Sequence, residues 1–218
     1  MVTLRTTRPV VKPKRTYDAR RRQEAAAATR HRVTEAAEQR FLSDGYGATT
    51  VAAVAADAEV SVDTIYKSFG GKPGLVRAIR QRALEGAGPI PAERRSDELQ
   101  AREADPRAII QGWGAFTAEI GPRAAPILLL IRSAAATDVE VRSLQDEMDA
   151  ARLARMTSNA RRLLAGGHLR TGIGLAQAAD VLWTYSSPEL FELLVLRRGW
   201  SAERYGRFVA AAMIAALL

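Results

Sequence analysis

Apolar residues recur at helical spacing along most of the chain, and this pattern predicts a protein built from helices. The first helical pattern runs from Asp18, a candidate N-cap, to about Leu42, and Gly45 and Gly47 end it. Val33, Ala36, Ala37, Arg40 and Phe41 fall on one stripe of that helix, with Arg40 its only polar member.

Two short helices are predicted next, at Val51–Ala58 and Ser61–Ser68, with a break between them at Glu59-Val60. Thr50 and Ser61 are the candidate N-caps of this pair. Gly70-Gly71 closes the second short helix, and Lys72-Pro73 opens a fourth helix whose apolar side reaches Leu84.

The rest of the chain predicts further helices separated by glycine and proline breaks, with no alternating strand pattern. The polar stretch Glu93–Ala104 favours a boundary or a mobile connection, and Gly121-Pro122 is expected to end the helix that Asp105-Pro106 begins. The later helices are expected at 123–136, 138–165, 175–185, 189–197 and 201–218.

These elements predict an all-α fold with four parts. A disordered basic arm covers 1–17, and a three-helix helix-turn-helix domain covers 18–71. A connecting helix and linker cover 72–104, and a larger helical domain covers 105–218.

The charge of the chain is concentrated at its N-terminal end. The formal net charge is +8, with 16 Lys and Arg against 8 Asp and Glu in residues 1–82, and 16 against 16 in the remainder. A basic module joined to a neutral one is typical of nucleic-acid binding, although a solvated basic tail gives the same count. Cysteine is absent, which favours a reducing cytoplasm, and the apolar runs 124–131 and 208–218 are too short to span a bilayer.

Two short helices joined by a tight break suit a helix-turn-helix, in which the second helix enters the major groove of DNA. An ordinary surface hairpin of helices has the same pattern. The run Thr49–Phe69, with Gly45-Tyr46 before it and Gly70–Leu75 after it, resembles the N-terminal signature of the TetR family of bacterial repressors over about residues 22–79.

This resemblance implies a set of DNA contacts at matching positions. Thr50, Tyr66 and Lys72 are expected to hold phosphates. Ser61 begins the recognition helix, on which the residues expected to face bases are Val62, Asp63, Thr64 and Lys67. Glu59 departs from the family, which usually has glycine in this turn. If the position needs a positive φ, glutamate there costs about 1 kcal/mol.

The C-terminal part carries candidates for ligand binding and assembly. The aromatic and methionine residues that line either a ligand cavity or an ordinary core are Trp113, Phe116, Met148, Met156, Trp183 and Tyr185. The segments Leu175–Arg197 and Ser201–Leu218 are candidates for a homodimer interface, although the alanine-rich last helix suits packing within its own subunit equally well. His31 and His168 lie in no metal-binding spacing, and neither a metal nor a cofactor is expected.

The function expected is that of a cytoplasmic transcriptional repressor that a small-molecule effector releases from its operator. As a homodimer it would bind a pseudo-palindromic site in double-stranded DNA. One alternative is an architectural DNA-binding protein without a ligand. The other is an enzyme, against which stand the missing cysteine, the two scattered histidines and the lack of a P-loop or nucleophile elbow.

Overall fold

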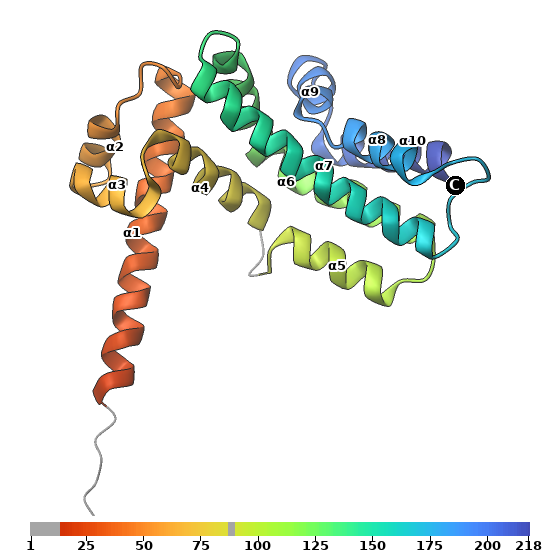
Figure 1. Ribbon diagram of the computed structural model, residues 1–218, viewed down its shortest axis with the longest axis horizontal. Helices are drawn as coiled ribbons and strands as arrows, with labels where there is room; N and C mark the ends of the chain where they lie inside the picture. Colours follow the sequence, from red (N-terminus) through yellow and green to blue (C-terminus); the bar gives the residue numbers. More distant parts are fainter. Residues whose placement is uncertain (1–13, 87–89) are drawn as a thin grey trace, which may run out of the picture.

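The computed structural model describes residues 14–86 and 90–218, with side chains from residue 20 onward, and every element in these ranges is a helix. A unit of three helices, α1 to α3, stands at one end of the molecule, and the remaining helices form a larger body beside it (Figure 1). Helix α4 (Lys72–Glu85) crosses from the first unit to the second.

The N-terminal unit consists of α1 (Lys14–Asp44), α2 (Val51–Asp57) and α3 (Val62–Phe69). Its core holds the apolar stripe predicted on α1, in which Val33, Ala37 and Phe41 are fully buried. The prediction that helix begins at Asp18 is wrong, because α1 already includes residues 14–17 of the proposed disordered arm. Residues 1–13 of that arm lie outside the described residues.

The core of this unit continues into the rest of the molecule without a gap. Leu75, Val76 and Ile79 of α4 are buried in the same cluster as Ile127 and Ile131, which lie on α6. The three-helix unit is therefore packed onto the body rather than tethered to it.

Helix α6 spans Pro106–Ala135 without interruption, so the predicted break at Gly121-Pro122 is wrong. Pro122 and Pro126 each lack the N–H that would bond to the preceding turn, at a cost of about 3 kcal/mol. The helix continues because it packs against α1, α4, α7 and α10, and Ala124, Ala125 and Ile127 behind the prolines are buried. Within the described ranges, only α6 is long and apolar enough by length and composition to cross a membrane, a weak sign that soluble core helices share.

The stretch expected to be a mobile connection is instead largely helix α5 (Ala92–Arg102). Ion pairs hold it on both sides, from Arg95 to Glu119 of α6 at 2.7 Å and from Asp97 to Arg155 of α7 at 3.0 Å. The prediction failed because the charged residues that made this stretch resemble a linker form the ion pairs that hold α5 against α6 and α7.

The remaining elements match the predicted segments closely. They are α7 (Val139–Ala165), α8 (Leu175–Tyr185), α9 (Pro188–Phe191), the π-helical turn η1 (Glu192–Arg197) and α10 (Ala202–Leu217). Helix α10 crosses α6 at two glycines: a Cβ added to Gly206 would lie 2.5 Å from the Gly114 carbonyl oxygen. One face of the alanine-rich last helix is thus buried in its own subunit.

Candidate nucleic-acid interface and ligand cavity

Side-chain caps fix the start of both short helices. The Ala53 N–H donates to Thr50 Oγ1 at 3.1 Å, and the Thr64 N–H donates to Ser61 Oγ at 3.1 Å. Ile65 anchors α3 from below, because its side chain is fully buried in the core of the unit. Both predicted N-caps are confirmed, and they hold α2 and α3 as a fixed pair.

The turn between α2 and α3 contains a non-glycine residue, Glu59, in the left-handed conformation that the sequence analysis considered for this position. Glu59 has φ +53°, and it is the one non-glycine residue with a positive φ in the described parts of the chain. The Glu59 N–H donates to the Ala56 carbonyl and the Val60 N–H to the Ala55 carbonyl, at 3.2 and 3.0 Å. These two bonds form a Schellman motif, in which Glu59 occupies the position that glycine normally takes.

The outer face of α3 is open to solvent and carries the residues predicted to face DNA. Val62 and Tyr66 are 41% and 56% exposed although both are large and apolar or aromatic. Lys67 forms an exposed ion pair with Asp63 one turn earlier, at 2.7 Å. Thr64 is half-buried, and its hydroxyl lies 2.8 Å from that of the capping Ser61.

Lys72 has structural contacts that the sequence did not predict. Its Nζ donates to the Tyr46 carbonyl at 2.6 Å, reaches the Gly47 carbonyl at 3.5 Å and lies 4.3 Å from the centre of the Tyr46 ring. Burial lowers the pKa of Lys72. The ammonium therefore fastens the start of α4 to the loop after α1, and one N–H is left for a phosphate, a contact that stays a prediction.

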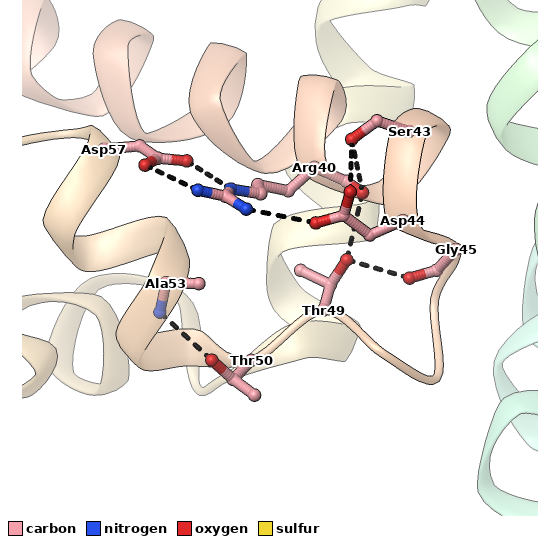
Figure 2. Close-up of polar contacts among 8 residues, drawn as sticks. All are labelled: Arg40, Ser43, Asp44, Gly45, Thr49, Thr50, Ala53 and Asp57. Carbon is pink, nitrogen blue, oxygen red and sulfur yellow. Dashed lines mark hydrogen bonds and ion pairs between the residues drawn. The ribbon is translucent and has the colours of Figure 1, made fainter.

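A polar cluster that the sequence did not reveal joins α1 to α2 (Figure 2). The Arg40 guanidinium donates to both carboxylate oxygens of Asp57, at 2.5 and 3.0 Å, and to Asp44 at 3.1 Å. The Thr49 hydroxyl donates to the Arg40 and Gly45 carbonyls, which closes the loop between the helices. Hydrogen bonding from Arg40 lowers the pKa of Asp57. The signal available in the sequence was Arg40 itself, a polar residue in an apolar stripe.

A cavity of about 210 Å³ lies among α4 to α10 in the body of the molecule. Four of the six residues predicted to border a ligand cavity line it, namely Trp113, Phe116, Met148 and Met156. The other two, Trp183 and Tyr185, do not, so that part of the prediction is wrong. They fail because one sequence shows which residues are aromatic but not which way a helix is turned.

Both excluded residues have structural contacts. Tyr185 packs against the C-terminal core. Trp183 lies under the Arg152 guanidinium, 4.5 Å from the ring centre, and its carbonyl accepts a hydrogen bond from that group. Arg152 itself does line the cavity, and composition alone had not marked it. In the described ranges, no group of His, Cys, Asp and Glu residues could hold a metal ion.

A known protein family matches the region of the helix-turn-helix. The family model described as "Bacterial regulatory proteins, tetR family" matches residues 33–79, which run from α1 into α4. The N-terminal domain is a TetR-type DNA-binding domain. No curated protein matches the chain significantly.

Solved structures extend the likeness beyond the TetR-type domain. A TetR-family transcriptional regulator from Rhodococcus sp. is 17% identical, with a TM-score of 0.64 over 88% of this chain and 100% of that one. FadR from Bacillus subtilis in complex with stearoyl-CoA is 16% identical, with a TM-score of 0.65 over 86% and 99%. A SmeT–triclosan complex is 21% identical, with a TM-score of 0.64 over 88% and 92%. At these identities the likeness establishes the fold, which is that of TetR-type regulators along nearly the whole chain.

Proposed function

We propose that this protein is a dimeric, DNA-binding transcriptional repressor that a small-molecule effector releases from its operator. The observation that carries the proposal is the face of α3 in the TetR-type domain, where Val62, Asp63, Tyr66 and Lys67 stand in solvent on a helix fixed from behind by Ile65. Short or flexible side chains at the start of such a helix reach base edges in the major groove.

DNA binding is tested by selecting a preferred duplex from randomised sequences and titrating it by fluorescence anisotropy. Lys67→Ala is expected to relax the preference at one base pair, with a loss of roughly 5- to 150-fold there. Arg94→Ala is the matched control, because Arg94 is also an exposed cation in an i,i+4 pair, with Glu98, but lies on α5.

Two outcomes would refute this part of the proposal. One is a wild-type protein that selects no sequence. The other is binding that does not weaken between low and physiological salt, because phosphate contacts by the basic N-terminal part release counterions.

The proposed dimer uses the outer faces of the C-terminal segments. Phe208, Ala211 and Ala215 form an exposed stripe on α10, and Leu193 and Leu196 of η1 are 51% and 55% exposed. A second copy of this surface would cover apolar area that otherwise faces water. Two α3 helices would then read the two halves of a pseudo-palindrome.

Sedimentation at micromolar concentration tests the dimer. Ala211→Glu places a charge in the stripe and is expected to give monomers that bind the operator poorly. Ala151→Glu, on the exposed side of α7, is the control and is expected to remain dimeric. A monomeric wild type would overturn the proposed assembly.

The effector is proposed to act through the cavity and α4. Arg80 and Leu84 of α4 line the cavity, while Leu75 and Val76 of the same helix are buried with the DNA-binding domain. Two of the structural neighbours hold a small molecule, stearoyl-CoA in one and triclosan in the other. A ligand that favours one position of α4 would change the separation of the two recognition helices in the dimer. We place this regulator in the cytoplasm.

Coupling of about 1–3 kcal/mol would lower operator affinity roughly 5- to 150-fold. By reciprocity, operator DNA would weaken ligand binding by the same factor. Titration of any ligand found by thermal shift, with and without operator, gives the test. Equal affinities in the two titrations would exclude that ligand as an inducer.

A further inference from the structure

The cavity is apolar over most of its wall. Trp113, Phe116, Met148 and Met156 line it from α6 and α7, and Leu182 closes it from α8. An apolar cavity of about 150 Å³ accepts benzene. The 210 Å³ here therefore has room for an apolar group of roughly eight to ten non-hydrogen atoms.

One wall of this apolar space carries a cation that is largely shielded from solvent. The side chain of Arg152 is only 16% exposed. It donates to the Trp183 carbonyl at 2.5 Å and to Ser186 Oγ at 3.2 Å, which are neutral acceptors. Among the described residues its one carboxylate contact is with Asp149, at 3.3 Å, and the Asp149 side chain is 42% exposed. Desolvation lowers the pKa of Arg152, so its charge is weakly compensated.

A second cation faces the same space. Arg80 of α4 lines the cavity, has no direct ion pair within the described parts of the chain, and is close enough to contribute to lowering the pKa of Arg152. Its charge also acts at longer range on Glu147, whose pKa it helps to lower. Two like charges beside one cavity raise the potential for an anion. The other charged residues of the wall are paired or open to solvent: Arg132 with Glu189, Arg155 with Asp97, the exposed Glu93, and Asp149, whose long contact is with Arg152 itself.

A buried hydroxyl without a partner also borders the cavity. Tyr205 is 1% exposed, and its hydroxyl forms no hydrogen bond with the described residues. A buried polar group without a partner costs about 1–3 kcal/mol, so such groups in native proteins call for an explanation. A ligand atom in the cavity would supply the missing partner.

We propose that the effector is a small monoanionic amphiphile, a carboxylic acid with an apolar body of roughly eight to ten non-hydrogen atoms. Its carboxylate binds Arg152 and Arg80, and its body lies against Trp113 and Phe116. This inference rests on the proposed function of the cavity as the effector site. Because Arg80 belongs to α4 and Arg152 to α7, one anion held by both would fix the connecting helix against the body.

Calorimetric titration with octanoate tests the inference without DNA. The wild type is expected to bind octanoate, and to bind the uncharged 1-octanol and the cationic octylamine much more weakly. Along the series from butanoate to dodecanoate, affinity should rise about fourfold per methylene group and then level off once the apolar body reaches roughly eight to ten carbons and fills the cavity. Octanol that binds as tightly as octanoate would overturn the proposal.

Variants of the two cations give the residue-level test. Arg152→Gln is expected to lower octanoate affinity roughly 10- to 150-fold, the range for hydrogen bonds to charged groups. Arg80→Gln should lower octanoate affinity less. It guards against misfolding of the first variant because Arg80 has no direct ion pair to lose, only a longer-range attraction to Glu147. Arg107→Gln, an exposed cation in the first turn of α6 outside the cavity, is the charge control and should bind as the wild type does.

The outcomes separate this inference from the proposed function. Operator binding is measured in parallel on the same preparations. Intact operator binding without octanoate binding, or unchanged octanoate affinity in both Arg152→Gln and Arg80→Gln, overturns the inference and leaves the DNA-binding function standing. Loss of octanoate affinity in both variants, with the control unchanged, supports it.

Discussion

Replacing Glu59 with glycine should stabilise the protein, although the residue lies on the surface. A non-glycine residue in the left-handed region costs about 1–2 kcal/mol, and Glu59 has φ +53°. Part of this gain is lost, because glycine has more conformational freedom in the unfolded chain, which lowers the free energy of unfolding by about 0.4–1 kcal/mol. The net expectation for Glu59→Gly is a gain of about 0.5–1 kcal/mol. In a chain of this size that corresponds to a rise in Tm of about 1–4 °C.

Glu59→Gln is the matched control, since it removes the charge but keeps a side chain at the same φ. Thermal unfolding followed by circular dichroism should show a higher Tm for Glu59→Gly and no rise for Glu59→Gln. A rise of equal size in both variants would show that charge, not backbone conformation, sets the cost. A lower Tm for Glu59→Gly would refute the argument from the Schellman turn.

The same pair of variants separates stability from DNA binding. A carboxylate roughly 10 Å from a phosphate in water costs about 0.4 kcal/mol, which is about twofold in affinity. Both variants remove that carboxylate and should bind operator about twofold more tightly at low salt. The gain should shrink as salt rises, because salt screens exposed charges.

Three further predictions follow from packing and pairing. Asp57→Asn should lower the Tm at neutral pH, and the difference from the wild type should shrink as pH falls below 3.8 and vanish as pH passes the lower folded-state pKa, because the hydrogen bonds from Arg40 hold the pKa of the folded-state carboxyl below its usual value. Gly206→Ala should destabilise by about 1–3 kcal/mol in urea unfolding, since its Cβ would meet the Gly114 carbonyl; an unchanged midpoint would contradict the close crossing. Tyr205→Phe should leave the empty protein as stable or raise its stability by about 1 kcal/mol, and a clear loss in thermal melts would reveal a partner for the hydroxyl.

The DNA-binding unit was largely predictable because its signals are local. Caps at Thr50 and Ser61, the break at Glu59 and the inward Ile65 each depend on a few neighbouring residues. The Arg40–Asp57 pair was not predictable, because its partners are 17 residues apart and nothing in the spacing joins them.

The body of the molecule was harder to predict because tertiary packing overrides local signals there. Gly121-Pro122 inside α6 predicted a break, yet packing on several sides keeps the helix continuous. The polar composition of α5 read as a linker because the carboxylates and guanidiniums that pair with it belong to distant parts of the chain. The cavity depends on how several helices are rotated about their axes, which explains why four of six candidates reached it and Trp183 and Tyr185 did not.

The shared core of the N-terminal unit bears on the exchange of modules between regulators. A chimera cut at residue 71 would separate α1–α3 from Leu75, Val76 and Ile79, which complete their core, and from Ile127 and Ile131 on α6. An N-terminal unit from another regulator, joined at residue 71, would pack against side chains that its own core does not match and would leave cavities at the contact. An exchanged N-terminal unit that keeps DNA recognition should therefore include α4, and its packing surface should match the ends of α6 and α7 that it contacts.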